Sequence, residues 1–262
     1  MFNPNNYKVH CSAIGNIMAE PKAVAQPKPY TATELKKAEK EGIILPEIQP
    51  LILTPEQKIN TGTKTILEHW RKEQIYRKDK SFGVSSKHTR KGILTEGEAI
   101  EFLIENGIIG YSTKNEEPFE NDFLIGTPDI KFPSKSLLVD VKCSWDCFTF
   151  PDLETELNPL YEWQVLGYME LLQYKSAKVI YCLMDAPESI IEQQAYIYAR
   201  SKESELTEEF YEEVRQHLSY SHLPPELRIK VFDVEYNPEK IQKIKQRVED
   251  CRAYLNTLSK CK

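Results

Sequence analysis

The residues best suited to chemistry lie in one stretch, residues 126–145, with the sequence GTPDIKFPSKSLLVDVKCSW. Asp129 follows a proline in a turn, and Asp140 and Lys142 lie two residues apart in an apolar run that predicts a strand. Side chains two residues apart in a strand point to the same face. Two carboxylates and an amine directed at one small volume are typical of a divalent-metal phosphodiesterase site.

Each of these residues has a plausible role in phosphodiester hydrolysis. The reaction needs a nucleophilic water, neutralisation of the phosphoryl oxygens and help for the leaving oxygen, and Mg²⁺ or Mn²⁺ held by carboxylates can supply all three. We expect Asp129 and Asp140 to be direct ligands and the Val141 carbonyl to be a further oxygen donor. Lys142 would orient or deprotonate the attacking water and stabilise the charge of the transition state.

The alternative for Asp140 and Lys142 is an ordinary solvated strand face. The neighbouring residues are apolar, so both charged side chains would lie beside a core, where a charge is costly unless it is paired or metal-bound. The two interpretations stay open on these residues alone.

Net charge argues against nonspecific coating of nucleic acid, because 34 Lys and Arg residues oppose 40 Asp and Glu, for a formal charge of −6. Positive charge is nevertheless concentrated in residues 71–91, where two acidic side chains face eight cationic ones: Arg71, Lys72, Arg77, Lys78, Lys80, Lys87, Arg90 and Lys91. This run predicts a path for a phosphate backbone, and a merely solvated charged face is the alternative.

Other cofactor sites and membrane insertion are not indicated. The six cysteines contain no C-x-x-C pair and the five histidines are scattered, so neither zinc nor an iron–sulfur cluster has its usual spacing. The longest apolar run, residues 179–184, is far shorter than the roughly 20 residues that span a bilayer. We expect a soluble intracellular protein with reduced thiols.

Apolar periodicity and cap residues indicate which elements position these side chains. Ser12 is a candidate cap of a short helix, Thr31 with Glu34 is a candidate capping box, and Thr54 with Gln57 is another. Residues 81–89 predict a mobile loop, and residues 195–198 could form a strand instead of helix. The expected helices are 31–41, 54–77, 92–107, 158–174, 187–201, 205–219 and 237–258, and the expected strands are 108–113, 121–125, 130–132, 137–144, 177–184 and 228–236.

Four separated motifs make the chain similar to the PD-(D/E)XK nuclease superfamily, in its branch of lambda-type exonucleases and YqaJ-like viral recombinases, with RecB-like nuclease motifs. Residues 11–18, CSAIGNIM, resemble the serine-containing N-terminal helix of that branch. The others are Gly92-x-x-x-Glu96-x-x-Ala99, then Gly126 to Asp129 with Asp140-x-Lys142, and Gln164-x-x-x-Tyr168. The motifs keep the order of the family over residues 11–168.

The resemblance implies further roles in the site. Glu96 would be an additional metal ligand or contact a metal-bound water, although Glu98 on a neighbouring helix face is an alternative. Gln164 would orient Lys142 or the scissile phosphate. Tyr168 would pack beside them or stack on DNA, and Ser12 would contact the substrate.

The chain departs from the family pattern at two points. Asp140 replaces the commoner Glu, which shortens the reach to a metal by one methylene. No motif places the arginine that receives a terminal 5′-phosphate, so Arg77 and Arg90, with Lys87 between them, are candidate DNA contacts and the polarity of digestion stays open.

The resemblance implies an α/β fold with a restriction-endonuclease-like core, a mixed central sheet flanked by helices. We expect one domain over residues 1–262, with a substrate-contacting part (1–90), a catalytic core (91–185) and C-terminal flanking elements (186–262). The implied activity is Mg²⁺-dependent exonucleolytic digestion of linear double-stranded DNA in phage or prophage recombination, in the cytoplasm of a bacterial host. A single-strand annealing protein and a ring-shaped homo-oligomer are the implied partners. The alternatives are a restriction or repair endonuclease and a non-catalytic DNA-binding protein.

Overall fold

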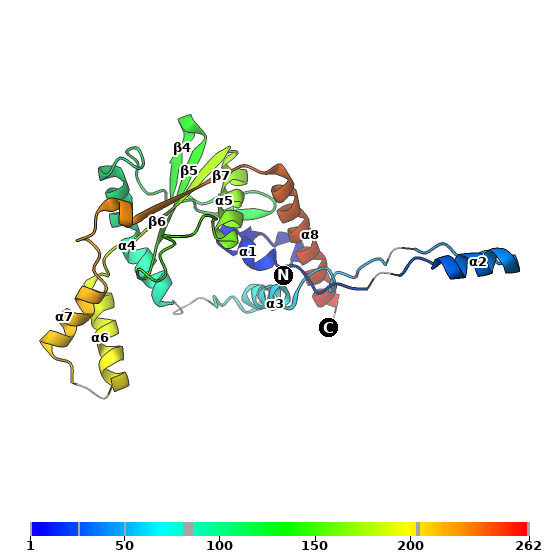
Figure 1. Ribbon diagram of the computed structural model, residues 1–262, viewed down its shortest axis with the longest axis horizontal. Helices are drawn as coiled ribbons and strands as arrows, with labels where there is room; N and C mark the ends of the chain where they lie inside the picture. The colour runs from blue at the N-terminus through cyan, green and yellow to red at the C-terminus, as the bar shows by residue number, and fades with distance from the viewer. Residues whose placement is uncertain (1, 26, 50, 81–85, 203–204, 261–262) are drawn as a thin grey trace.

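A mixed four-stranded sheet forms the centre of the fold (Figure 1). The computed structural model describes residues 2–25, 27–49, 51–80, 86–202 and 205–260. The strand order is β4-β5-β6-β7, with β5 and β6 parallel and the other neighbours antiparallel. The strands are β4 (Ile130–Phe132), β5 (Leu137–Cys143), β6 (Ser176–Cys182) and β7 (Ile229–Glu235). The expected α/β fold with a mixed sheet is confirmed.

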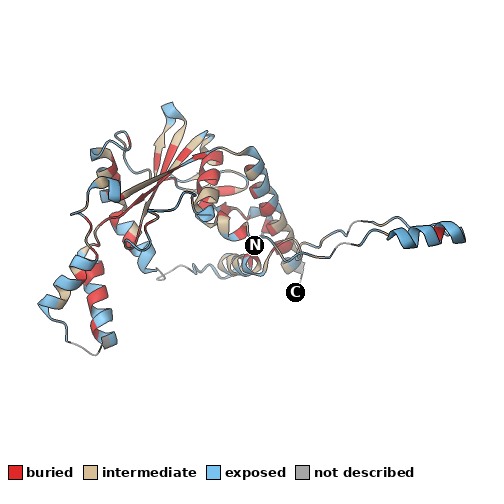
Figure 2. Ribbon diagram, viewed as in Figure 1, coloured by how far each residue is buried: buried red, intermediate tan, exposed pale blue. Residues whose placement is uncertain are grey.

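Helices cover both faces of this sheet, and the alternation of β5 divides its side chains between them. Leu138 packs in the core beneath α5 (Pro159–Leu172), together with α1 (Ile14–Ile17), α3 (Thr61–Tyr76) and α8 (Pro238–Lys260). Val139 and Val141 pack in a second core beneath α4 (Lys87–Glu105) on the opposite face. Figure 2 shows the buried residues concentrated along these strands and the helix faces against them. Asp140 and Lys142 therefore lie on the α5 face.

A second, three-stranded sheet joins the N-terminal segment to the middle of the chain. Its order is β1-β3-β2, with β1 (Val9–His10) parallel and β2 (Phe119–Glu120) antiparallel to β3 (Leu124–Gly126). β3 starts later than the predicted strand 121–125. The Asn121 side chain accepts hydrogen bonds from the backbone N–H groups of Phe123 and Leu124, which forms a turn before the strand. β3 ends at the turn that carries Asp129.

The CSAIGNIM segment is placed by close packing against α5. It forms a 3₁₀ helix, η2 (Cys11–Ala13), followed by α1, and Cys11 and Ile14 are fully buried. A Cβ at Gly167 of α5 would lie 2.4 Å from Cδ1 of Ile14, and a Cβ at Gly15 would lie 2.9 Å from Cα of Leu160. Glycine is therefore needed on both sides of this crossing. The prediction that Ser12 caps the helix is wrong, because the capping positions are His10 and Ala13.

Two elements stand away from the sheet. The pair α6 (Glu188–Lys202) and α7 (Glu208–His217) packs around its own small apolar core, and the alternative strand at 195–198 is wrong because these residues are helical. α2 (Ala32–Glu41) lies at the tip of an extended arm (Figure 1), and its predicted Thr31–Glu34 capping box is confirmed. Across the described ranges, no helix has both the length and the apolar composition that a membrane crossing requires.

Several predicted boundaries are wrong for local reasons. α3 begins at Thr61 because Asn60 caps it, whereas Thr54 and Gln57 only close a preceding turn. α4 begins at Lys87 because the Ser86 hydroxyl accepts from the N–H of Thr89, so residues 87–89 are helical. The other part of the predicted loop, residues 81–85, lies outside the described residues.

The predicted strand at 108–113 is also wrong. The chain leaves α4 through Gly107, which has a φ of +67°, and then runs without regular structure towards β2. Ile109 is buried in the core beneath α4, whereas Ile108 and Tyr111 are exposed. The buried side chain of Ile109 anchors residues 108–113 to the core. The backbone of these residues pairs with none of the described strands.

Candidate active site

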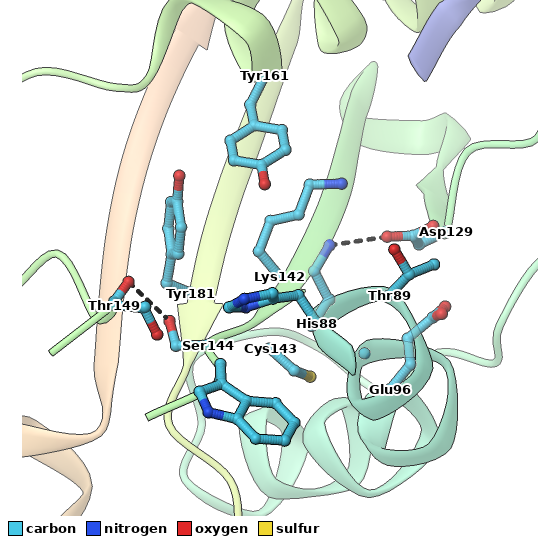
Figure 3. A pocket seen from close by; sticks show the side chains of 13 residues that line it. His88, Thr89, Glu96, Asp129, Lys142, Cys143, Ser144, Thr149, Tyr161 and Tyr181 are labelled. Carbon is cyan, nitrogen blue, oxygen red and sulfur yellow. Dashed lines mark hydrogen bonds between the residues drawn. The ribbon is translucent and has the colours of Figure 1, made fainter. Parts of the chain in front are cut away.

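A cavity of about 350 Å³ opens between the first half of α4 and the C-terminal half of β5 (Figure 3). Figure 3 shows Glu96 and Asp129 on one side of Lys142, and Tyr161 and Tyr181 on the other. The lining residues are His88, Thr89, Gly92, Glu96, Asp129, Val141, Lys142, Cys143, Ser144, Trp145, Thr149, Tyr161 and Tyr181. The structure therefore brings four of the predicted site residues, Glu96, Asp129, Val141 and Lys142, to one cavity.

Asp140, Lys142 and Gln164 form a connected cluster on the α5 face of the sheet. Nζ of Lys142 lies 2.8 Å from Oδ2 of Asp140 and 3.4 Å from Oε1 of Gln164. The Gln164 amide nitrogen donates to Oδ1 of Asp140 at 3.1 Å and to the hydroxyl of Tyr168 at 3.2 Å. The Asp140 side chain is only 1% exposed, against 20% for Lys142. The interpretation of a solvated strand face is therefore wrong.

The charge state of Lys142 follows from this cluster. Burial acts to lower the pKa of Lys142, but the Asp140 and Asp129 carboxylates outweigh burial and raise it. The ammonium also lies 4.8 Å from the ring centre of Tyr161, a cation–π contact that favours the same charged form. Lys142 is accordingly a cation in the metal-free protein.

Asp129 occupies the place where β4 and β5 separate. The last paired residues are Ile130 and Val139, so the N–H of Val141 has no β4 carbonyl to bind, and it donates instead to Oδ2 of Asp129 at 2.8 Å. Burial, followed by repulsion from Asp140, raises the pKa of Asp129 to about 8.

Glu96 reaches the cavity from α4. Its side chain is 17% exposed, and Oε1 lies 3.0 Å from Nζ of Lys114. Glu98 is exposed and does not line the cavity. The geometry favours Glu96 over Glu98 as the acidic residue of this helix.

The oxygen atoms of the site fit a hard divalent cation that keeps part of its water. Among the described residues, Oδ2 of Asp140 and Oε1 of Glu96 are buried without a hydrogen-bond donor, and the ammonium groups of Lys142 and Lys114 lie 2.8 Å and 3.0 Å from them. Within the described ranges, no three His, Cys, Asp or Glu side chains are grouped closely enough to hold an ion by themselves. A hard divalent cation can be held by one or two carboxylates with waters completing its shell, so Asp129 and Asp140 with the Val141 carbonyl are candidate ligands.

The predicted DNA-contacting residues are distributed over several surfaces. Ser12 and Arg77 are exposed, Arg77 at the C-terminal end of α3. Lys87 lies 4.6 Å from the ring centre of Trp145 at the cavity, and Arg90 donates to Gln193 of α6 at 2.7 Å. Tyr168 is 5% exposed and bonded to Gln164, so it packs beside the cluster, and the interpretation that it stacks on DNA is wrong.

Lys91 is a buried structural residue and is not part of the basic surface. It is fully buried, and its ammonium donates to the carbonyls of Trp145 at 2.8 Å and Met184 at 2.7 Å. These carbonyls follow β5 and β6, so Lys91 ties α4 to the ends of the two central strands. Burial lowers the pKa of Lys91 to about 8. Its partners are 54 and 93 residues away, and the sequence contains no signal for that pairing.

Tyr161 and Lys114 are among the site residues that sequence reasoning missed. Tyr161 lies in the first turn of α5, one helical turn before Gln164, and this spacing could have indicated that it faces the same strand. Lys114 lies in the irregular segment after α4, where no periodicity indicates its direction.

Comparisons with solved structures show a shared fold. A phage-related exonuclease from Haemophilus somnus 129PT matches with a TM-score of 0.68 and 23% identity, over 98% of this chain and 97% of that one. LHK-Exo, an alkaline exonuclease from Laribacter hongkongensis, matches with a TM-score of 0.55 and 13% identity, over 95% and 88%. Its complex with dAMP matches with a TM-score of 0.55 and 12% identity, over 97% and 90%. No protein-family model and no curated protein matches the sequence.

Proposed function

We propose that this protein is a metal-dependent deoxyribonuclease, and specifically an exonuclease that digests linear double-stranded DNA in phage or prophage recombination. The observation that carries the proposal is the buried Asp140–Lys142–Gln164 cluster beside Asp129 and Glu96. The fold likeness supports it, since nearly the whole chain follows a phage-related exonuclease. Mg²⁺ is the proposed cofactor, with Mn²⁺ as a substitute.

The chain's own residues would divide the work as follows. Asp129, Asp140 and the Val141 carbonyl hold the cation, and Glu96 binds it directly or through a water. The bound cation supplies a nucleophilic water and neutralises phosphoryl oxygens. Lys142, kept cationic by its carboxylate neighbours, stabilises the charge that develops on the phosphate and orients the water.

Gln164 would act by positioning. Its amide bridges Asp140 and Lys142 with one group donating and the other accepting, so it fixes both side chains in one arrangement. The Tyr168 hydroxyl accepts a hydrogen bond from the same amide and so restrains it. Ordered side chains of this kind lower the cost of arranging charges during the reaction.

The phosphate backbone would approach along the basic side of the cavity. Lys87 and the exposed His88 begin α4 at the cavity entrance, and Arg77 ends α3 before residues 81–85. Arg90 and the exposed Ser12 are further candidate contacts. Such contacts supply affinity without base specificity.

End-labelled DNA tests this function. Linear duplexes with and without a 5′-phosphate are incubated with Mg²⁺, with Mn²⁺ and with chelator, and closed circular DNA is incubated in parallel. Progressive shortening of linear DNA with untouched circles supports the exonuclease. Prompt linearisation of circles would establish the endonuclease alternative, and binding without cleavage in either metal would establish the non-catalytic one. The same assay decides the polarity.

The assembly and the cellular setting are also proposals. We infer a ring-shaped homo-oligomer, a single-strand annealing protein as partner, and action in the cytoplasm of a bacterial host. One nuclease domain over the whole chain, with the parts 1–90, 91–185 and 186–262, is inferred with them. Light scattering measures the oligomer, and limited proteolysis followed by mass spectrometry tests the single domain.

A further inference from the structure

The irregular segment between α4 and β2 runs beside the turn that carries Asp129. Asn115 fastens it: the Asn115 backbone N–H donates to the carbonyl of Asp129 at 2.7 Å, and its side-chain amide donates to the carbonyl of Pro128 at 2.9 Å. The same amide donates to the carbonyl of Glu117 at 3.0 Å, which closes the segment on itself. The backbone of this segment is therefore joined to the turn that carries Asp129.

Lys114, the residue before Asn115, extends from this fixed point to α4. Its ammonium lies 3.0 Å from Oε1 of Glu96, an oxygen that is buried and accepts no hydrogen bond. The Lys114 side chain is 45% exposed, against 17% for Glu96. Lys114 can thus swing into solvent without opening a cavity in the core, whereas Glu96 cannot move in the same way.

The Lys114–Glu96 contact is one of several pairings that the carboxylates of the site make. Three carboxylates surround the site, and each meets a different group: Asp140 meets Lys142, Asp129 meets the N–H of Val141, and Glu96 meets Lys114. Lys142 is embedded in the cluster with Gln164. Lys114 is the more exposed of the two cations, because its side chain is 45% exposed against 20% for Lys142.

We propose that Lys114 is an internal placeholder for the metal: its ammonium neutralises and positions Glu96 in the metal-free protein, and a divalent cation displaces it. The inference rests on the proposed metal site and adds a residue to it. Without Lys114, Glu96 would be a mostly buried carboxylate that interacts unfavourably with Asp129, a costly arrangement. Lys114 keeps Glu96 directed into the cavity until the cation takes over its charge, and Asn115 holds the segment in place during the exchange.

Competition between Lys114 and the cation has a definite sign. Removal of the ammonium removes a competitor for Glu96 and a positive charge that repels the cation, so metal binding becomes tighter. We expect Lys114→Met to lower the dissociation constant about two- to fivefold, the scale of an ion pair with one partly exposed partner. A purely structural lysine would leave the constant unchanged or raise it.

The test is a Mn²⁺ titration of the full-length protein without DNA, followed by the electron paramagnetic resonance signal of free Mn²⁺. Lys131→Met is the matched control, because Lys131 pairs with Glu117 of the same segment at 3.2 Å, and Glu117 is 69% exposed. Both variants lose one positive charge. Tighter Mn²⁺ binding by Lys114→Met than by Lys131→Met supports the proposal, and equal or weaker binding overturns it.

Two further variants keep the outcome decisive. Lys114→Arg retains the charge and should bind Mn²⁺ as the wild type does, and Lys114→Gln replaces Lys114→Met should the latter fail to unfold cooperatively. Glu96→Gln and Asp129→Asn test the site itself. Mn²⁺ binding that is absent in the wild type, or unchanged in both of these variants, would refute the proposed metal site, whereas unchanged binding in Lys114→Met alone refutes only the placeholder.

Discussion

Replacement of Lys142 by Met should destabilise the metal-free protein far more than loss of a surface charge. The Asp140 side chain is 1% exposed, and its ion pair with Lys142 spans 2.8 Å. Without the ammonium, the hydrogen bond from Gln164 at 3.1 Å is the one that the buried carboxylate keeps among the described residues. An uncompensated buried charge is among the few changes that cost several kcal/mol.

The geometry of the Asp140–Lys142 pair sets the expected loss in the free energy of unfolding. Removing one partner of a buried ion pair costs about 3–5 kcal/mol. The remaining hydrogen bond and the partial exposure of Lys142, 20%, place this pair near the lower end, so we expect a loss of about 3 kcal/mol. Asp140→Asn should cost less, because the stranded ammonium can reach water. The double variant should recover much of the loss, because no buried charge is left unpaired.

Urea unfolding followed by circular dichroism in EDTA measures these free energies of unfolding. Lys178→Met is the matched control, since Lys178 pairs with Asp233, which is 74% exposed, on the same sheet, and its loss should cost at most about 1 kcal/mol. DNA cleavage should be abolished by Lys142→Met and by Asp140→Asn. The reasoning is refuted if Lys142→Met is no less stable than the control, and the site assignment is refuted if either variant cleaves at the wild-type rate.

Three other predictions concern pH, packing and DNA binding. Burial and Asp140 raise the pKa of Asp129 to about 8, so the folded metal-free protein keeps a proton that the unfolded chain releases at about pH 4. The free energy of unfolding in EDTA should therefore fall as pH rises from about 5 to 8. Asp129→Asn should flatten this pH dependence, measured by urea titration. Gly15→Ala should lower the melting temperature, because its Cβ would lie 2.9 Å from Cα of Leu160. Gly97→Ala, in open space within α4, should instead raise the free energy of unfolding by about 0.5–1 kcal/mol. Equal melting temperatures for the two variants would contradict the close crossing. Lys87→Gln should weaken binding of all duplexes alike and reduce the slope of log K against log salt by about 1 in fluorescence anisotropy, and an unchanged slope would remove Lys87 from the interface.

The strand of the site was predictable because its signal is local. The apolar run of residues 137–143 indicates a strand, and the period of two places Asp140 and Lys142 on one face. The Asn158–Pro159 start of α5 is a similar local signal. The mixed sheet flanked by helices, which the motifs also implied, is the fold that the chain shares with the solved exonuclease structures.

Errors arose where a local signal competed with packing. Ser12 has the right chemistry for a cap, yet the burial of Cys11 and Ile14 against α5 decides where the helix begins. The Ile-rich start of 108–113 favours a strand, but Ile109 enters the α4 core and the rest finds no partner among the described strands.

The sequence by itself determined which side chains share a strand face, which helices follow, and that two carboxylates and a lysine could meet. Only the tertiary structure decided that Asp140 is buried and paired, that Asp129 takes the N–H of Val141 where β4 ends, and that Lys91 is internal. The physical reason is range: periodicity and capping act within a few residues, whereas burial and ion pairing depend on groups far apart in the chain. Lys114 lies beside Glu96 of α4 in a segment that Asn115 fastens to the Asp129 turn, a contact between residues with no shared local signal.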